Sequence, residues 1–181
     1  MTTNSDTSPP SFQSQNVLRQ ALVILLGAGA IALGAQISTP MVPVPTTLQT
    51  LALVFLGLCF GPFLAMGAAS AYLVMVLIGL PVLSSGQQVP GWEFTQFLAA
   101  GYVVGFIPGA GLAGWLGRQG GFLRRTLAGL AGHSIILLLG AVVMAYWLDP
   151  STALERGVLP FLFGALAKSL AAAALMSGID R

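Results

Sequence analysis

Charged residues are scarce in this sequence. Only 7% of the 181 residues are Asp, Glu, Lys or Arg, whereas 56% are hydrophobic and the mean hydropathy is +0.88. A soluble domain of this length has too little interior to bury so much apolar surface. The seven basic residues are scattered and form no patch for a phosphate backbone, which argues against nucleic-acid binding. The composition therefore predicts a protein whose solvent is a lipid bilayer.

Residues for covalent, metal or nucleotide chemistry are equally scarce. Cys59 is the one cysteine, so no internal disulfide is expected. His133 is the one histidine and has no Cys, Asp or Glu at ligand spacing, so we expect a structural role for it and no metal site. The sequence has no glycine-rich phosphate loop with Lys and Ser, so an ATP-driven step has to come from partners. We expect neither an enzyme nor a bound cofactor.

Long apolar runs make up most of the chain. Residues 1–16 are polar without hydrophobic periodicity and are predicted to be a disordered cytoplasmic tail. Residues 17–181 are predicted to be one all-α, polytopic membrane domain with six transmembrane helices. The second run is short for a span of about 20 residues. The predicted helices cover 17–38, 46–61, 63–80, 95–117, 126–148 and 158–177.

The charges between the runs predict the orientation, because basic residues collect on the cytoplasmic side. One side would hold Arg19, Arg118, Arg124, Arg125 and Arg181, and the other Glu93, Asp149, Glu155 and Arg156. With six spans the two termini share a side. Both termini are therefore predicted to be cytoplasmic, in a multi-pass protein of the cell membrane.

A lysine lies inside the last predicted helix. In GVLPFLFGALAKSL, residues 157–170, Lys168 follows a run of mostly Leu, Phe, Ala and Gly. An ammonium near mid-bilayer costs about 3 kcal/mol or more, so such a lysine marks a candidate functional site. Gly164 and Ala165 share its helical face and leave space, and no acidic residue lies within a span. Two interpretations stay open: an anionic ligand, or a lysine that is uncharged or capped by carbonyls.

Three prolines interrupt the link between the first two helices, STPMVPVPTTLQT at 38–50. The link is either a Pro-rich turn in which threonine caps the next helix, or a broken helix that lines a binding site. Gln49 lies a turn deeper than capping needs, and Thr47 supplies another polar group. Both are candidate substrate-binding residues.

Three aromatic side chains are further candidates for the binding site. Tyr72 and Tyr102 lie inside predicted helices, where each hydroxyl needs a partner from a neighbouring helix or from a ligand. Trp92 lies in the polar loop 81–94, which is either a lid over a small amphipathic ligand or a segment that Trp92 anchors at the membrane interface.

Small residues recur at one-turn spacing on two helices and allow close helix contacts. The first helix has Ala28 and Ala32 on such a face. The fourth has a longer ridge of Gly101, Gly105, Gly109, Ala113 and Gly117. Each ridge either packs inside the monomer or docks on another membrane protein.

Four stretches carry a resemblance to a known family: AQISTPMVPVPTTLQTLAL at 35–53, GPFLAMGAASAYLVMVLIGLPVLSSG at 61–86, GYVVGF at 101–106 and GVLPFLFGALAK at 157–168. Together they resemble the BioY family, the biotin-specific substrate-binding membrane component (S component) of energy-coupling factor (ECF) transporters. The resemblance implies an S-component-like membrane protein that binds biotin from outside. Its implied partners are a transmembrane coupling protein and two cytoplasmic ATPases.

The resemblance also implies roles for single residues. By position, Lys168 matches a family lysine that meets the polar end of the ligand, and Gln49 and Tyr102 match residues of motifs near the pocket. Docking of the coupling protein is implied at the small-residue face with Ala28 and Ala32. Two departures stand out. Ala165 replaces the usual acidic residue three positions before the lysine, and FTQFLAA at 94–100 replaces a Gly-Pro-Thr-Gly run.

We therefore expect a biotin-binding transport component in which Lys168 holds the valerate carboxylate or another polar group. The two departures motivate an alternative, a divergent member that binds another small vitamin or organic acid, or that works as a solitary transporter. A third hypothesis is an intramembrane enzyme that uses Lys168 or His133. It has no carboxylate, serine–histidine pair or metal cluster to support it.

Overall fold

The computed structural model describes residues 11–179, with side chains from Asn16 onward. Most of this chain is helical, which confirms the predicted all-α fold. Residues 1–10 of the predicted tail and Arg181 lie outside the described residues. The first helix begins at Ser11, six residues before its predicted start, so the tail was predicted too long at this end. The long helices are α1 (Ser11–Gln36), α2 (Gln49–Phe60), α3 (Pro62–Leu77), α5 (Ala100–Gly117), α6 (Phe122–Trp147) and α8 (Leu159–Ile179).

Not all of the long helices reach the length of a membrane span. In the part of the chain that the structure describes, four stretches are long and apolar enough to cross a bilayer: Asn16–Gln36, Ala100–Gly117, Phe122–Trp147 and Pro150–Ile179. The other two, α2 with 12 residues and α3 with 16, are shorter. Gly61 alone separates α2 from α3 and has a φ of +85°, a conformation that favours glycine. The shortness predicted for the second helix is thus confirmed.

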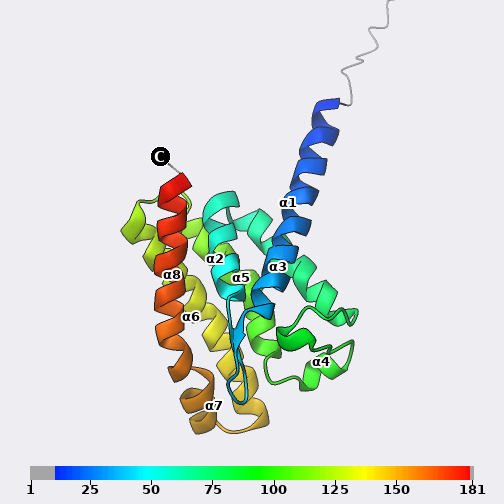
Figure 1. Ribbon diagram of the computed structural model, residues 1–181, viewed down its shortest axis with the longest axis vertical. Helices are drawn as coiled ribbons and strands as arrows, with labels where there is room; N and C mark the ends of the chain where they lie inside the picture. The colour runs from blue at the N-terminus through cyan, green and yellow to red at the C-terminus, as the bar shows by residue number, and fades with distance from the viewer. Residues whose placement is uncertain (1–10, 180–181) are drawn as a thin grey trace, which may run out of the picture.

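A β-hairpin precedes α2, which is too short to cross a bilayer by itself. Strands β1 (Ser38–Thr39) and β2 (Thr46–Thr47) pair antiparallel, with Ser38 opposite Thr47. Figure 1 shows the hairpin continuing from α2 toward the end of the bundle where α7 (Pro150–Gly157) lies. Non-helical backbone at membrane depth is tolerated where it is buried in protein or lines a cavity. The hairpin therefore fits the interpretation of 38–50 as a broken segment at a binding site.

The two ends of the bundle differ in their connections. The described ends of α1 and α8 lie together at one end, whereas the hairpin, α4 (Glu93–Gln96) and α7 lie at the other (Figure 1). Arg124 and Arg125 lie in the first turn of α6, at the end that carries the termini. A short 3₁₀ turn, η1 (Ser84–Gly86), lies in the loop before α4. The end with the hairpin, α4 and α7 is called the hairpin end below.

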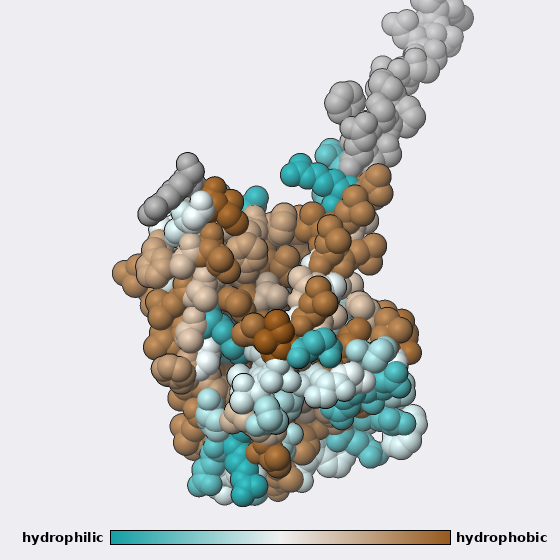
Figure 2. Space-filling model, in the orientation of Figure 1, coloured by the Kyte–Doolittle hydropathy of each residue, from teal (hydrophilic) through white to brown (hydrophobic). Residues whose placement is uncertain are grey.

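The outer surface of the bundle is apolar, as a lipid-facing surface must be. Leucines of α1 such as Leu25, Leu26 and Leu33 are exposed, and so are Phe63 of α3 and Phe163 of α8. Figure 2 shows hydrophobic residues over most of the visible face, with hydrophilic residues gathered at the hairpin end. Because exposed apolar helices of this length need a bilayer, the chain is a membrane protein.

The glycine ridge of α5 packs inside the monomer. Gly101, Gly105, Gly109, Ala113 and Gly117 are all buried. A Cβ atom at Gly105 would lie 3.0 Å from Cα of Ile136 on α6, and one at Gly109 would lie 2.9 Å from the carbonyl oxygen of Gly132. Small residues thus let α5 and α6 touch along their backbones, which settles the two interpretations of this ridge in favour of internal packing.

Helix α7 lies outside the long helices and is capped by an acidic residue. The side chain of Asp149 accepts hydrogen bonds from the Ser151 hydroxyl at 2.5 Å and from the Thr152 backbone N–H at 2.8 Å. These bonds stabilise the carboxylate and lower the pKa of Asp149 to about 2. The hydrogen bond from the Ser151 side chain has the largest effect. The cap fixes where α7 begins, and Gly157 at the end of α7 contacts the site described next.

Candidate functional site

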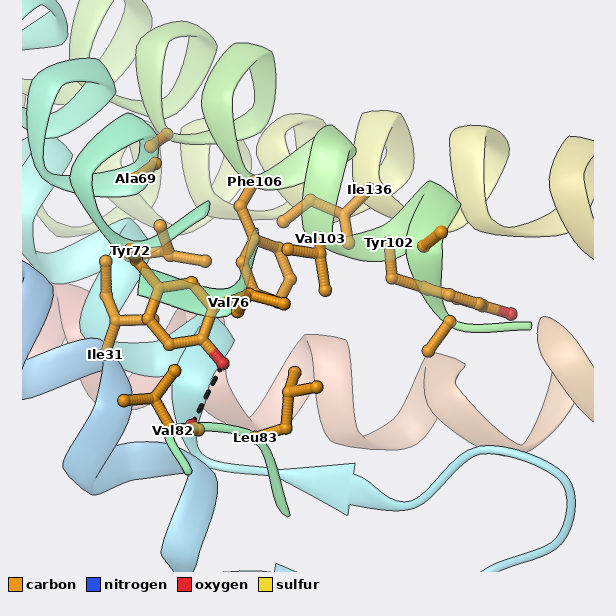
Figure 3. Packing of buried hydrophobic residues seen from close by; sticks show 14 of the residues in the cluster. Ile31, Ala69, Tyr72, Val76, Val82, Leu83, Tyr102, Val103, Phe106 and Ile136 are labelled. Carbon is orange, nitrogen blue, oxygen red and sulfur yellow. Dashed lines mark hydrogen bonds between the residues drawn. The ribbon is translucent and has the colours of Figure 1, made fainter. Parts of the chain in front are cut away.

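A cavity opens between the hairpin, the loop 79–99 and helices α2, α5, α6 and α8. Its walls are mostly apolar, and aromatic rings from three parts of the chain contribute to them: Phe97, Tyr102, Phe106 and Phe161. In Figure 3, Val103 and Phe106 of α5 project toward Leu83 of the loop. All three side chains line the cavity. Such a site suits a small ligand with a flat apolar body, held in orientation by a few polar groups.

Most of the predicted binding residues lie in this cavity. Lys168, Gln49, Thr47 and Tyr102 line it together, although they come from α8, α2, the hairpin and α5. Tyr72 and Trp92 do not line it. The tertiary structure thus brings four of the six predicted substrate-binding residues to one site.

Gln49 is fixed by bonds within the protein. Its Oε1 accepts a hydrogen bond from the Thr47 hydroxyl at 3.0 Å, and its Nε2 donates to the Tyr72 hydroxyl at 2.5 Å. Tyr72 is fully buried and donates in turn to the Val82 carbonyl at 3.1 Å (Figure 3). The chain of bonds links the hairpin, α2, α3 and the loop after α3. Tyr72 therefore lies behind the cavity and positions Gln49, rather than lining the wall.

Thr47 contributes to both interpretations of the Pro-rich link. Its hydroxyl oxygen accepts from the backbone N–H of Gln49 at 3.3 Å, which satisfies one free donor at the start of α2. The same threonine lines the cavity. The link is therefore a hairpin that caps the start of α2 and also lines the cavity.

Lys168 lies near the middle of α8, half-buried, with its stem along the cavity wall. Its ammonium donates to the Thr50 hydroxyl of α2 at 3.2 Å. Within residues 16–179 no carboxylate forms an ion pair with it, because Glu93, Asp149 and Glu155 lie outside the long helices. Within that part of the chain, the ammonium is thus bonded by the Thr50 hydroxyl and not by backbone carbonyls. The ammonium keeps two further donors for a ligand.

Tyr102 presents its ring, not its hydroxyl, to the cavity. The hydroxyl donates to the Gly157 carbonyl at 2.7 Å, so its partner is the neighbouring α7. The ring lies 5.9 Å from that of Phe161, centroid to centroid, and both rings line the cavity. The partner of the Tyr102 hydroxyl is therefore a neighbouring helix of the protein and not a ligand.

The loop 81–94 covers part of the cavity without its tryptophan. Leu83, Ser84 and Gln87 line the cavity, and the Leu83 carbonyl accepts from Nε2 of Gln36 on α1 at 3.0 Å. Trp92 is 70% exposed and does not line the cavity, which fits the interpretation as an interfacial anchor. Its role as a binding residue stays a prediction.

His133, like Thr50, is a cavity residue that was not among the predicted binding residues. It lies in α6, is 4% exposed and lines the cavity. A structural role was predicted for His133 because no potential metal ligand lies near it in the sequence. Spacing could have found it, because His133 and Ile136 lie one turn apart on one face of α6. Within the described residues no group of three His, Cys, Asp or Glu side chains could hold a metal ion.

The small-residue face of α1 is used inside the monomer. Ala28 has no exposed surface, and a Cβ atom at the neighbouring Gly27 would lie 2.8 Å from Cβ of Ala68 on α3. Ala32 is partly buried against the same core. Ala28 is therefore not accessible to a partner in this arrangement of the helices, and docking at this face stays a prediction.

Comparison with known proteins places the chain in a family. A family model described as the BioY family matches residues 3–181. The chain belongs to the BioY family. A biotin transporter BioY from Thermotoga maritima is 31% identical over 158 residues, which cover 86% of this chain and 92% of the relative. A probable biotin transporter BioY from Pyrococcus horikoshii is 30% identical and covers 85% of this chain and 91% of the relative.

The fold agrees with that membership. A crystal structure described as the S-component for biotin from an ECF-type ABC transporter matches this BioY chain with a TM-score of 0.77, at 20% sequence identity. The match covers 92% of this chain and 93% of the other. The S-component-like fold expected from the sequence motifs is thus confirmed.

Proposed function

We propose that this BioY family member is the membrane-embedded, biotin-binding S component of an ECF-type transporter, which captures biotin from the outer side. The observation that carries the proposal is the ammonium of Lys168, which lies in an apolar cavity with Thr50 as its hydrogen-bond partner. The relatives at 31% and 30% identity are named as biotin transporters. This naming favours biotin over another vitamin or organic acid.

The chemistry of the cavity supports a ligand of this kind. Biotin has an apolar ring body and a short aliphatic chain, with a polar ureido group at one end and a carboxylate at the other. Apolar and aromatic walls suit the body, and Lys168 offers an ammonium to an oxygen of either polar group. Gln49 and Thr47 form the polar rim at the hairpin.

We further propose that the hairpin end faces outward and that the termini are cytoplasmic. The arginines at the start of α6 lie at the end with the termini, and Glu93, Asp149 and Glu155 lie at the other. This distribution follows the positive-inside rule. A cavity that is lined by the hairpin then opens toward the side from which a nutrient arrives.

A transmembrane coupling protein and two cytoplasmic ATPases are the proposed partners. Ala32, which keeps part of its surface exposed, is the remaining docking candidate on α1. Ala32→Trp is expected to abolish recovery of the complex in a pull-down while the chain still folds, whereas Ala28→Trp is expected to be far more destabilising because Ala28 is fully buried. Recovery of a normal complex with Ala32→Trp would exclude this face.

Equilibrium binding of labelled biotin to the full chain in detergent tests the main proposal. We expect saturable binding by the native chain and at least a roughly 100-fold loss in Lys168→Ala, since a charge-assisted contact with a buried ligand group is removed. Arg156→Ala, at an exposed position outside the cavity, is the matched control for loss of one positive charge. Unchanged affinity in Lys168→Ala would remove the lysine from the site.

Uptake measurements separate a driven component from a solitary transporter. Cells that express the chain with the coupling protein and ATPases are compared with cells that express the chain alone. Because the sequence contains no nucleotide-binding loop, we expect concentrative uptake only with the partners. Equal accumulation in both strains would establish the solitary alternative.

A further inference from the structure

The single histidine of the chain lies in the wall of the cavity with one ring nitrogen unused. His133 Nδ1 lies 2.9 Å from the Gly129 carbonyl oxygen and 3.1 Å from the Ser169 hydroxyl oxygen. Its Nε2 is buried and has no hydrogen-bond partner within the described residues. Buried polar atoms are almost always paired, so an unpaired one in a cavity wall points to a ligand.

The surrounding bonds determine which nitrogen carries the proton. The Gly129 carbonyl can only accept. Ser169 donates its one hydroxyl proton to the Ala165 carbonyl at 2.8 Å, so its oxygen can only accept from the ring. Both neighbours of Nδ1 therefore require a proton on that nitrogen. In a neutral ring, Nε2 is then left with a free lone pair and acts as an acceptor.

The charges around the cavity favour the neutral ring. Lys168, the residue before Ser169 on α8, lines the same cavity and brings one positive charge. Among residues 16–179 no acidic side chain lines the cavity. A second buried cation beside the first, with no carboxylate to balance it, is unfavourable. His133 thus enters the site as an acceptor, not as a second cation.

The polar groups of α6 and α8 form a complementary pair. Among the cavity-lining side chains of these two helices, His133 and Lys168 are the polar ones, and Ala165 beside them has no polar group. Lys168 can only donate, and Nε2 of His133 can only accept. A ligand that satisfies both must carry an acceptor oxygen and an N–H donor, which are adjacent in an amide or a cyclic urea.

We propose that Nε2 of neutral His133 accepts a hydrogen bond from a ureido N–H of the bound ligand. The proposal rests on the proposed function, because biotin is the ligand that brings this group. It assigns His133 a role in substrate recognition and gives Ser169 and Gly129 the role of holding the ring in the accepting tautomer.

Two substitutions separate ligand recognition from structural support. In His133→Asn the side-chain amide can replace Nδ1 at the Gly129 carbonyl but does not reach the position of Nε2. In His133→Gln the longer side chain can place an amide oxygen at the position of Nε2. If His133 only supports the fold, the Asn variant should bind normally. If Nε2 recognises the ligand, the Asn variant should lose affinity and the Gln variant should recover part of it.

The test measures the binding of biotin, and of two biotins that are methylated on one or the other ureido nitrogen, to the full-length native chain and both variants. We expect the native chain to bind one methylated isomer about 10- to 100-fold more weakly than biotin, because the buried acceptor loses its donor. His133→Asn should bind biotin more weakly by a similar factor and should no longer discriminate against that isomer. Native biotin affinity in His133→Asn, or full discrimination by that variant, would overturn the proposal.

Nuclear magnetic resonance gives a second readout without a variant. Because the chain has one histidine, 15N-labelled histidine in protein purified without a histidine tag reports His133 alone. We expect a protonated Nδ1 and a bare Nε2 in the free chain, and a shift of the Nε2 resonance on addition of biotin. A protonated Nε2 in the free chain would overturn the proposal. Failure of the native chain to bind biotin at all would overturn the proposed function itself, whereas biotin binding that ignores His133 would overturn only this inference.

Discussion

The two ends of the bundle contrast in how their helices are held. At the hairpin end, Tyr102 and Phe106 of α5 line a cavity. At the other end, the same helix carries Gly114, where a Cβ atom would lie 2.8 Å from the Gly57 carbonyl oxygen and 2.8 Å from the Pro62 nitrogen. Large side chains hold neighbouring helices apart and form the walls of a cavity, whereas glycines let the helix backbones touch. Gly114 packs against backbone away from the cavity, so a substitution there should change stability without touching the cavity lining.

Of the variants that test this contrast, Gly114→Ala at the closed end should have the largest effect on stability. Gly114→Ala places a methyl group against backbone atoms that cannot move aside, so we expect the free energy of unfolding to fall by about 3 kcal/mol. Gly29→Ala on α1 is the matched control, because nothing lies within 4 Å of its added Cβ. Unfolding in mixed detergent measures both variants. Equal stability of the two would contradict the close packing.

At the open end, Lys168→Met should act in the opposite direction. The variant keeps the unbranched shape and most of the length of the side chain but removes an ammonium that has only Thr50 as a partner in the described protein, so stability should rise by about 2 kcal/mol. Biotin binding should be lost at the same time. The same unfolding assay, with the binding assay beside it, checks both outcomes. A less stable variant would show that the lysine supports the fold.

Tyr72→Phe tests the bonds behind the cavity. The change leaves the Val82 carbonyl and one N–H of Gln49 unpaired in the interior, so we expect a loss of about 1 to 2 kcal/mol in stability. Biotin affinity should fall moderately because Gln49 loses its support. Trp92→Ala is the comparison, since this exposed residue lies outside the cavity, and its affinity should stay within about twofold. A stronger binding defect in Trp92→Ala than in Tyr72→Phe would reverse the assignment.

The smallest effect is expected at the cap of α7. The pKa of Asp149 is lowered to about 2, below the ordinary value near 3.9. Its stabilising effect is therefore complete above about pH 4 and is lost as the pH falls through about 2. Amide hydrogen exchange in α7, compared at pH 5 and pH 2 after correction for the intrinsic rate, should show loss of protection at the lower pH. In Asp149→Asn this pH dependence should disappear, and its persistence would implicate another group.

Periodicity and composition predicted the helices well, and the reason is physical. A bilayer requires every backbone polar group to be paired internally, so long apolar runs have almost no alternative to helices. The glycine ridge of α5 was likewise visible, because close contact needs small side chains wherever it occurs. The boundaries were less accurate: α5 begins at Ala100 rather than residue 95, because 93–96 forms the separate α4.

The candidate site was predicted unevenly, and the errors share one cause. Gln49 and Thr47 were found because proline marked their segment, and Lys168 because a charge in an apolar run is costly. The side of a helix that faces a partner, or the direction of an indole on a loop, depends on packing with distant residues. This is why local sequence could not show that Ala28 is buried, that Trp92 lies outside the cavity or that Thr50 and His133 line it.

Four features could be predicted without any structure: the lipid solvent of this protein, its helices, the break at 38–50 and the isolated ammonium of Lys168. These features follow from local chemistry: hydropathy, the missing N–H of proline and the cost of a charge in lipid. Three features became visible in the folded chain: the hairpin next to the short α2, the hydrogen bond from Lys168 to Thr50 and the position of His133 in the cavity wall. They depend on contacts between residues far apart in the chain, and no local pattern encodes which of these residues will meet.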